Sequence, residues 1–272
     1  MSNPFQIDGP AVISFSGGRT SAYMLRRILD EGLRPDVHVV FTNTGKERPE
    51  TLDFIQDCSN AWDVPVRWLE WREADPGYAE VSYATAARNG EPFEQLITLK
   101  SLRRAERGKA GGLLPNPVMR YCTQDLKIEV KKRFVRDVLG FSDWTNALGI
   151  RYDEPRRWRI LGQDERNPNE FKVGPLKEAR IDEPAVMAFW AKQHFDLQLG
   201  QYEGNCDLCF LKHPRKRERI LRDRPDLGEW WIEQERRTGT YFRMDTPAYA
   251  DLTNQGMLFE DGPDLIDCAC TD

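Results

Sequence analysis

Short apolar runs alternate with helical patterns over the first part of the chain. Residues 11–15, 37–42 and 66–70 are β-branched or aromatic runs of strand length, whereas Ser21–Leu29 and Thr51–Ala61 carry apolar residues at helical spacing. Parallel strands need crossover connections, so this alternation predicts an open parallel sheet with helices on both faces. We therefore expect an α/β, Rossmann-like fold.

The regular pattern stops between residues 74 and 117, where Gly, Pro and charged residues predominate. A stretch of this kind indicates an insertion, part helix and part loop. Regularity returns with a basic helix over Asp125–Val138, an apolar strand over Trp144–Ile150 and a helix that starts after Asp182 and runs through Ala191.

The C-terminal part differs in character from the rest of the chain. Residues 1–195 hold the alternating elements and are expected to form the nucleotide-binding domain. Residues 196–272 combine cysteines, loops and short charged helices, which indicates a small subdomain. Charge is polarised there: residues 210–224 hold seven Lys or Arg and two acids, and residues 245–272 hold seven acids and no Lys or Arg.

Composition is that of an ordinary globular chain, with 40% hydrophobic and 31% charged residues among 272. No apolar run approaches the roughly 20 residues that a membrane span requires. The segment Met1–Asp8 lacks the features of a signal peptide, so we expect a cytoplasmic protein. Six cysteines in such a chain are typical of thiols, metal ligands or redox groups rather than of a disulfide framework.

A glycine-rich turn, here called the glycine loop, follows the first strand and opens into a helix as Ser16-Gly17-Gly18-Arg19-Thr20-Ser21. Glycines let backbone N–H groups approach phosphate oxygens, and the helix N-terminus adds positive potential. The loop matches neither the Gly-x-Gly-x-x-Gly nor the Gly-x-x-x-x-Gly-Lys-Ser/Thr pattern. It therefore predicts a phosphate site of another class, with a ligand-free glycine turn as the alternative.

The loop resembles the PP-loop of the adenine-nucleotide α-hydrolase superfamily, which reads Ser-Gly-Gly-x-Asp/Thr-Ser, and the chain resembles the phosphoadenosine phosphosulfate (PAPS) reductase family within it. The likeness extends over further segments in family order. These segments are Phe41–Leu52, Arg120–Thr123 with Leu126-Lys127, Gly149–Arg157 and Gly174–Leu176. The resemblance implies the same α/β fold and an adenine nucleotide, ATP or PAPS, as ligand.

The resemblance also implies roles for matching residues. Phosphate or sulfate would be held by Ser16, Gly17, Gly18, Arg19, Thr20 and Ser21. Adenosine would lie near Thr42, Asn43 and Thr44, and the anion would be contacted by Lys127, Arg151 and Arg157. Of these, Arg19, Lys127 and Arg151 would take part in catalysis; taken singly, each cation is also compatible with a solvated surface position. Glu47 would organise the site, bind Mg²⁺ or lie on the surface.

Cysteine spacing points to a metal or cluster. The two-residue gap between Cys206 and Cys209 lets both thiolates reach one metal. With Cys122 and one cysteine of the C-terminal pair, Cys268 or Cys270, they would complete the four thiolates of a 4Fe–4S cluster. A structural zinc, reduced thiols and a dithiol redox pair are the alternatives, and Cys58, inside a predicted helix, is expected to be a packed thiol.

Two versions of sulfur chemistry follow from the resemblance. In the reductive version an electron donor is needed and Cys270 attacks the sulfur of an adenylyl sulfate; in the transfer version ATP adenylates an acceptor that then receives sulfur. The chain departs from the reductases because Cys122 is single and no Glu-Cys-Gly-Leu-His segment ends the chain.

The partner of this chemistry is less closely defined by the sequence. The basic segment Lys212–Arg219 is either a guide for a nucleic-acid acceptor or a solvated helix face. A nucleotide-binding subunit of a nucleic-acid modification or defence assembly is the alternative function, favoured by Thr20 in place of Asp. A homodimer is a further candidate assembly.

Overall fold

The computed structural model describes residues 3–165, 167–200 and 202–254. Its strands are β1 (Ala11–Ser14), β2 (Val37–Asn43), β3 (Val66–Trp71), β4 (Tyr78–Val81), β5 (Trp144–Leu148), β6 (Gly162–Asp164) and β7 (Asn167–Val173). Its helices are α1 (Arg19–Asp30), α2 (Pro49–Ala61), α3 (Glu91–Glu106), α4 (Tyr121–Thr123), α5 (Val130–Asp137), α6 (Pro175–Glu178), α7 (Glu183–Trp190), α8 (Pro214–Asp223), α9 (Gly228–Thr238) and α10 (Tyr249–Asn254).

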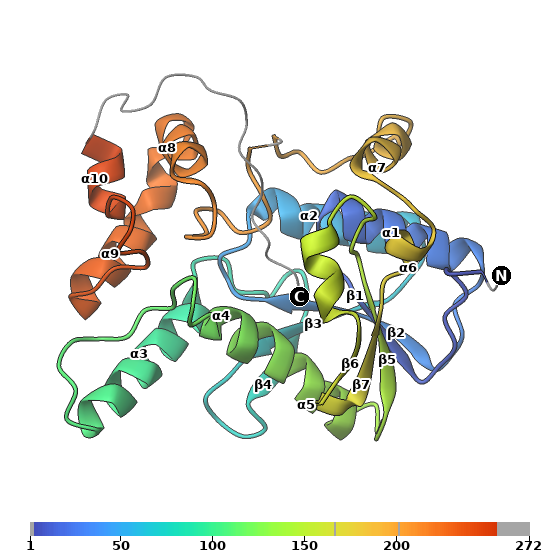
Figure 1. The fold of residues 1–272 in the computed structure, drawn as a ribbon, viewed down its shortest axis with the longest axis horizontal. Helices are drawn as coiled ribbons and strands as arrows, with labels where there is room; N and C mark the ends of the chain where they lie inside the picture. The colour runs from blue at the N-terminus through green and yellow to red at the C-terminus, as the bar shows by residue number, and fades with distance from the viewer. Residues whose placement is uncertain (1–2, 166, 201, 255–272) are drawn as a thin grey trace.

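These strands form one mixed sheet of order β4-β3-β2-β1-β5-β7-β6 (Figure 1). The five central strands run parallel, and β4 and β6 pair antiparallel at the two edges. The expected Rossmann-like parallel sheet is confirmed, with antiparallel edges that the sequence pattern did not predict. Its β1 strand lies at the centre, where the order of the chain reverses, and such a switch point is where open α/β sheets bind ligands.

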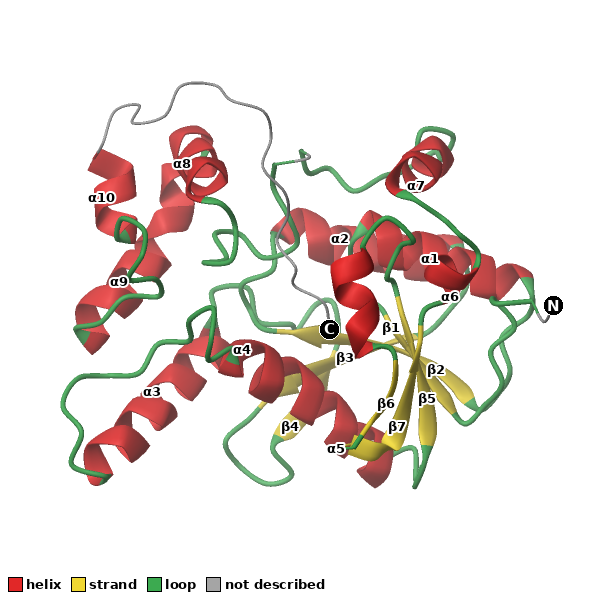
Figure 2. Ribbon diagram, viewed as in Figure 1, coloured by secondary structure: helices red, strands yellow, loops and turns green. Residues whose placement is uncertain are grey.

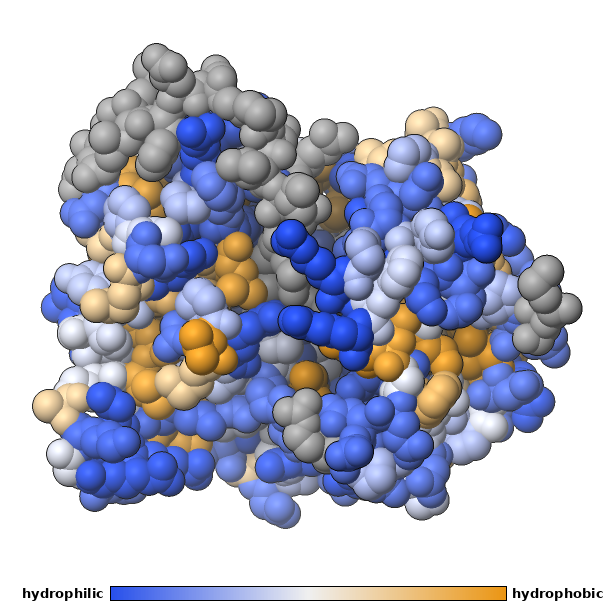
Figure 3. Space-filling model, in the orientation of Figure 1, coloured by the Kyte–Doolittle hydropathy of each residue, from blue (hydrophilic) through white to orange (hydrophobic). Residues whose placement is uncertain are grey.

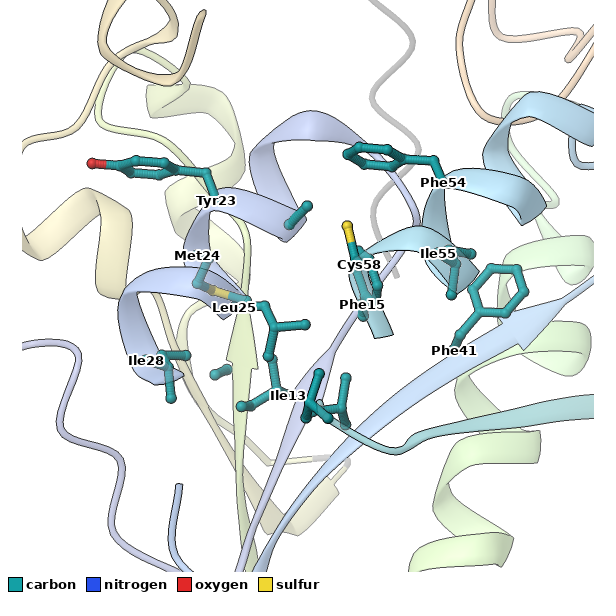
Figure 4. Close-up of a cluster of buried hydrophobic side chains, with 14 of the residues drawn as sticks. Ile13, Phe15, Tyr23, Met24, Leu25, Ile28, Phe41, Phe54, Ile55 and Cys58 are labelled. Carbon is teal, nitrogen blue, oxygen red and sulfur yellow. The ribbon is translucent and has the colours of Figure 1, made fainter. Parts of the chain in front are cut away.

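Helices cover both faces of the sheet (Figure 2). Alternate residues of β1 point to opposite faces, so Ala11 and Ile13 join one hydrophobic cluster and Val12 joins the other. The first cluster packs β1 and β2 against α1, α2 and α7, and part of it is shown in Figure 4. The second packs the sheet against α3 and α5. This two-sided burial explains why the central strands read as continuous apolar runs.

Strands β4, β6 and β7 were not expected from the sequence. Residues 74–117 contain the expected helical part, α3, and in addition the edge strand β4. Strand β7 was missed because its sequence, Asn-Pro-Asn-Glu-Phe-Lys-Val, is polar. Its buried Glu170 accepts hydrogen bonds from Asn146 (2.6 Å) and Asn167 (2.9 Å), so the strand is held by a polar network that no hydrophobic pattern reveals.

The basic helix starts earlier than expected and is irregular. Helix α4 begins at Tyr121 and continues through a π-helical segment, Gln124–Glu129, into α5. Such π-helical turns are frequent at functional sites. Tyr121 and Cys122 are therefore carried by the first turn of a helix rather than by a loop.

The C-terminal helices α8, α9 and α10 form a group on the same side of the molecule as α3 (Figure 1), and Trp230 and Trp231 of α9 contact Phe93 of α3. Their buried residues Ile220, Trp231 and Tyr249 belong to the same hydrophobic cluster as Phe93 of α3. In the described part of the chain no helix has the length and apolar character needed to cross a bilayer.

Trp190 of α7 connects the first core to the glycine loop. Its ring is 98% buried and contacts Phe54 with centroids 4.9 Å apart, and its indole N–H donates to the carbonyl of Arg19 at 2.9 Å. We expect Trp190→Ala to lower the free energy of unfolding by about 3–5 kcal/mol, as a large cavity does, in urea denaturation followed by circular dichroism.

The matched variant Trp190→Phe keeps an aromatic ring but loses the hydrogen bond to Arg19. Its loss should be smaller, because most of the buried apolar area is retained. A Trp190→Ala midpoint equal to that of the native chain would contradict this account of the core.

Candidate functional site

The glycine loop spans the end of β1 and the start of α1. Gly17 adopts φ +77°, a conformation that favours glycine, and a Cβ on it would lie 2.6 Å from Thr51 Cγ2 of α2. Gly18 caps α1 with an ordinary φ of −95°, and a Cβ there would lie 3.2 Å from the amide of Asn205. The first glycine is thus required by backbone conformation and packing, whereas at the second a Cβ would make only a tight contact with the side chain of Asn205.

A polar pocket of about 150 Å³ opens at this loop. It is lined by Ser14, Ser16, Gly18, Arg19, Thr20, Ser21, Leu148, Gly149, Arg157 and Asn205. Hydroxyl groups of Ser16 and Ser21 lie 3.0 Å apart at the loop. The pocket therefore has the hydroxyl groups and the helix N-terminus that bind phosphate or sulfate oxygens.

Arg157 is the cation best placed for an anion in this pocket. It lies on the 3₁₀-helix Pro155–Ile160 and pairs with Glu154 through one terminal nitrogen. Its Nε and its other terminal nitrogen are buried, with no hydrogen-bond partner in the described residues. Buried N–H groups without partners are costly, and a bound oxyanion would satisfy both.

Arg19 and Arg151 are held in ion pairs. Arg19 donates to both carboxylate oxygens of Asp196, at 2.7 and 2.8 Å, and also to backbone carbonyls in the segment that follows. Arg151 pairs with Asp153 at 2.9 Å and Glu183 at 3.2 Å, and donates to the Thr20 hydroxyl at 3.3 Å. Both side chains fix neighbouring segments around the loop in this arrangement.

One segment joins the glycine loop to the turn after β2. Asn205 donates its side-chain amide to the carbonyl of Ser16 at 2.7 Å, and its own carbonyl accepts from the backbone N–H of Arg48 at 2.7 Å. The next residue, Cys206, forms an antiparallel β-bridge with Glu47. The CxxC motif is therefore attached to the predicted phosphate loop.

The residues assigned to adenosine lie at the end of β2 and are buried. Asn43 is fully buried and donates to the carboxylate of Glu70 at 2.7 Å and to the carbonyl of Ala87 at 2.8 Å. Thr42 and Thr44 are 6% and 4% exposed, and neither lines the pocket at the glycine loop. Asn43 thus braces β2 against β3 and the chain after β4.

Three cysteines share a second, smaller cavity. Cys122 of α4 and Cys206 and Cys209 of the CxxC motif line it, together with Thr44, Lys46, Phe93, Thr123, Lys127, Phe210 and Trp231. In the described residues no group of three or more His, Cys, Asp or Glu is arranged to hold a metal ion. Cys268 and Cys270 lie outside the described residues.

Charged groups surround this cysteine cavity. Glu47 is 4% exposed, so it is not a surface residue; it accepts from the N–H and hydroxyl of Thr44 at 2.8 Å. Its other oxygen lies 3.6 Å from Lys127 Nζ and 3.8 Å from the sulfur of Cys206. The pKa of the Cys122 thiol is raised above its ordinary value by burial, and the Lys127 ammonium offsets only part of this rise. Lys127 thus lies at the cysteines and does not line the pocket at the glycine loop.

Asp207, inside the CxxC motif, contacts two residues that line the cysteine cavity, Lys46 and Trp231. Its carboxylate lies 2.7 Å from Lys46 Nζ and accepts from the indole N–H of Trp231 at 2.8 Å. All three side chains are buried. Cys58 is buried in α2, as expected for a packed thiol, and burial raises its pKa well above the usual range.

The predicted basic segment is not a uniformly solvated face. Lys212 and Arg217 are each 1% exposed. Lys212 donates to the carbonyl of Cys206, and Arg217 donates to the hydroxyl of Thr246 at 2.9 Å. Two of its cations are therefore structural, which the charge pattern alone did not indicate.

Sequence reasoning missed several residues that shape the site. Asn205 carried a weak signal, its place next to the CxxC motif. A buried chain of polar groups under the glycine loop carried none: Lys131 donates to Ser14 at 2.5 Å, and Ser14 donates to Asn146 at 2.8 Å, which in turn reaches Glu170. The first two contacts join residues more than 100 positions apart, and the third joins residues 24 positions apart.

Comparison with known protein families matches residues 10–192 to the phosphoadenosine phosphosulfate reductase domain. The chain belongs to this family. It is 28% identical to the uncharacterized nin region protein ORF290 of Escherichia phage lambda over 260 residues, which cover 92% of this chain and 82% of that protein. The predicted membership of the PAPS reductase family is thereby confirmed.

A crystal structure of PAPS reductase from Candida auris, a phosphate complex, is 16% identical to this family member. The match covers 70% of this chain and 75% of that one with a TM-score of 0.43.

The two glycines of the loop in this PAPS reductase family chain should respond differently to substitution. We expect Gly17→Ala to lower the free energy of unfolding by about 2 kcal/mol or more, because it adds an unfavourable φ and a clash with α2. Gly18→Ala should stay within about 1 kcal/mol of the native chain, since its φ suits alanine and its only close neighbour is a side chain.

Urea denaturation of both variants checks this prediction. Equal stability of the two variants would show that the positive φ and the contact with Thr51 do not constrain the loop.

Proposed function

We propose that this chain is an enzyme that binds an adenine nucleotide at the glycine loop and uses the neighbouring cysteines in sulfur chemistry. One observation carries the proposal: Asn205 contacts the glycine loop, and the next residue, Cys206, lines the cysteine cavity. Consecutive Cα atoms are about 3.8 Å apart. A nucleotide on the loop would therefore lie next to the thiols.

The pocket at the loop supports a nucleotide bound through its phosphates or sulfate. Backbone N–H groups at the start of α1 and the hydroxyls of Ser16, Thr20 and Ser21 offer neutral donors. Arg157 adds a guanidinium with two buried, unpartnered N–H positions. These groups would stabilise charge on the α-phosphate or sulfate as the bond to it breaks. ATP and PAPS both carry the required anion.

The cysteine cavity supports a cluster-binding role. Cys122, Cys206 and Cys209 face one cavity with apolar walls from Phe93, Phe210 and Trp231, and two lysines lie at its edge. The ammonium groups of Lys46 and Lys127 lie beside the thiols, and each also faces a carboxylate, Asp207 at 2.7 Å and Glu47 at 3.6 Å. By residue type these three cysteines, with Cys268 as the fourth, would supply the thiolates of a 4Fe–4S cluster, and a zinc ion is the alternative for the same thiolates. The described side chains are not arranged around a metal, so they would have to close on it. Such a cluster would supply electrons or hold sulfur.

Two reaction schemes use this arrangement. In sulfonucleotide reduction the thiolate of Cys270 attacks the sulfur of adenylyl sulfate, the S–O bond to the nucleotide phosphate breaks, and an electron donor reduces the resulting S-sulfonate. In sulfur transfer an acceptor oxygen attacks the α-phosphate of ATP, pyrophosphate leaves, and a sulfur nucleophile then displaces AMP. In both schemes the glycine loop and Arg157 hold the nucleotide.

A second candidate function is a nucleotide-binding module with reduced catalysis. It is favoured by the ion pairs of Arg19 and Arg151, whose charges are balanced by Asp196, Asp153 and Glu183. Release of pyrophosphate from ATP, or of sulfite from PAPS in the presence of a reductant, would exclude this alternative.

Arg157 provides the sharpest test of the nucleotide site. We expect Arg157→Gln to weaken binding of ATP or PAPS about tenfold to a hundredfold, because a hydrogen bond to a charged group contributes about 1.5–3 kcal/mol. Isothermal titration calorimetry with each nucleotide measures the change.

Arg159→Gln is the matched control, since Arg159 lies on the same 3₁₀-helix and is exposed. It should bind nucleotide as the native chain does. Equal affinity of native and Arg157→Gln proteins would remove Arg157 from the site.

Anaerobic purification with iron, sulfide and zinc analysis tests the cysteine site. We expect roughly four irons and four sulfides per chain and a broad absorption near 400 nm. Cys122→Ser, Cys206→Ser and Cys209→Ser should each lose most of the iron, because the cluster would lose a thiolate.

Cys58→Ser is the control, because Cys58 is buried in α2 and does not line the cysteine cavity. This variant should keep the iron of the native chain. If the native chain contains zinc and no iron, the cluster proposal is rejected in favour of a zinc site. Full iron retention in the Cys206 variant would remove that residue from the ligand set.

A further inference from the structure

A second cationic region lies on the insertion, away from the glycine loop. Residues 100–120 hold six Lys or Arg and one Glu, a net charge of +5 in a chain whose total is −5. They form the C-terminal half of α3 and the connection that leads to α4. Figure 3 shows hydrophilic residues gathered at the corner of the molecule where α3 ends. The sequence pattern predicts an insertion here, part helix and part loop.

Three of these cations are exposed and unpaired within the described part of the chain. Arg103, Arg107 and Lys109 are exposed, and their side chains make no hydrogen bond or ion pair with described residues. Arg104 bonds to the carbonyl of Ala110 and so shapes the turn that follows the helix. We call Arg103, Arg107 and Lys109 the basic end of α3. Their charge is directed at solvent, in contrast to the buried Lys212 and Arg217.

A polar cleft continues from the basic end of α3. Its walls come from α3, from the end of β3 and the turn that follows, from the π-helical segment Gln124–Glu129 and from α5. The four cations that line it are Arg72, Lys100, Arg103 and Arg133. Three acids also line it, and one of them, Asp125, is paired with Lys100 at 2.5 Å. Arg72 is paired with Glu70 at 2.7 Å, so Arg103 and Arg133 are the exposed cations beside a cleft volume of about 190 Å³.

An exposed aromatic side chain lies near the same end. The backbone N–H of Gly112 donates to the carbonyl of Thr238 at 2.8 Å, which joins the loop after α3 to the end of α9. Three residues beyond Thr238, Tyr241 is 49% exposed, and Met119 on the connection to α4 is 40% exposed. Cations interspersed with an exposed aromatic ring suit a chain that carries both phosphates and bases.

Helix α3 also connects this region to the cysteine cavity. Phe93 in its first turn lines the cavity, and Arg107 follows its last turn. At about 1.5 Å per residue the two positions are separated by about 20 Å along the helix. A strand bound at the basic end would therefore need to extend by only a few nucleotides to reach the thiols.

We propose that the basic end of α3, with its adjoining cleft, is a nucleic-acid-binding surface that presents the acceptor of the sulfur chemistry. This inference rests on the proposed function. Arginine predominates in the region, and its planar guanidinium suits phosphate oxygens. An anionic membrane is a poorer fit, because α3 buries Phe93, Leu96 and Ile97 in the core. The exposed large apolar side chains of this region are Leu102 on the helix and Val118 and Met119 on the connection to α4, and they are too few to form an insertion face.

The test is fluorescence anisotropy with labelled 20-nucleotide RNA, single-stranded DNA and duplex DNA, at several NaCl concentrations. The variant Arg103→Gln, Arg107→Gln, Lys109→Gln removes three charges. We expect its slope of log affinity against log salt to be smaller by about 2 for single strands and about 2.7 for duplex. At 50 mM NaCl its affinity should fall at least tenfold.

The matched control is Arg136→Gln, Arg180→Gln, Lys192→Gln, which removes three exposed cations from α5 and from the region of α6 and α7. It should bind nucleic acid as the native chain does. Equal losses in both triple variants would overturn the proposal, as would absence of nucleic-acid binding by the native chain or binding to phosphatidylserine vesicles in its place.

Calorimetry with ATP and PAPS separates this inference from the proposed function. Both triple variants should keep native nucleotide affinity, because neither changes a residue at the glycine loop. Nucleotide binding without nucleic-acid binding would reject the surface and leave the proposed function standing. Absence of nucleotide binding in the native chain would reject the proposed function itself.

Discussion

The segment Asn205–Asp207 bonds to both parts of the candidate site at once. Asn205 donates to the glycine loop, and its carbonyl and the N–H of Asp207 pair with the backbone of residues 46–48. Backbone groups buried in this way must be paired, so a shift of the segment would break bonds on both sides. The position of Cys206 is therefore fixed relative to the glycine loop.

Charge compensation determines which side chains remain available for a ligand. Buried charges are stable only when paired, and Arg19, Lys46 and Glu47 all have partners of opposite charge. The binding potential at the loop therefore rests on backbone N–H groups, hydroxyls and Arg157. A pocket built this way would recognise an oxyanion by directed hydrogen bonds more than by net positive charge. That distinction suits a nucleotide whose charge changes as it reacts.

The sequence was sufficient for the parts of the fold that depend on local patterns. Hydrophobic spacing and turn chemistry predicted the central strands, the glycine turn and the helix that follows it. The two-residue spacing of Cys206 and Cys209 predicted that these thiols lie together. Strand β7 could not be predicted, because Asn167 and Glu170 are buried by pairing with a residue on another strand. A hydrophobic pattern records burial of apolar residues only.

The roles of individual cations were equally hidden, for a related reason. Arg19 and Asp196 are 177 positions apart, and no local rule connects them. In the segment Lys212–Arg219 the run of positive charge suggested exposure, whereas Lys212 is buried against the carbonyl of Cys206. Motif resemblance assigned a role to Arg19 by residue type and order, and Lys212 was noted only as part of a basic segment. Their partners, which decide whether a charge is free, are set by tertiary contacts.

Helix α3 illustrates how one element serves two environments. Its first turns bury Phe93, Leu96 and Ile97 in the core and form a wall of the cysteine cavity, while its end carries Arg103 and Arg107 into solvent. At physiological ionic strength exposed charges are screened beyond about 8 Å. The acidic residues elsewhere on the chain therefore weaken the attraction of a polyanion to α3 only slightly at contact. Because the same rigid helix forms the cavity wall, a polyanion held at its end would have a defined position relative to the thiols.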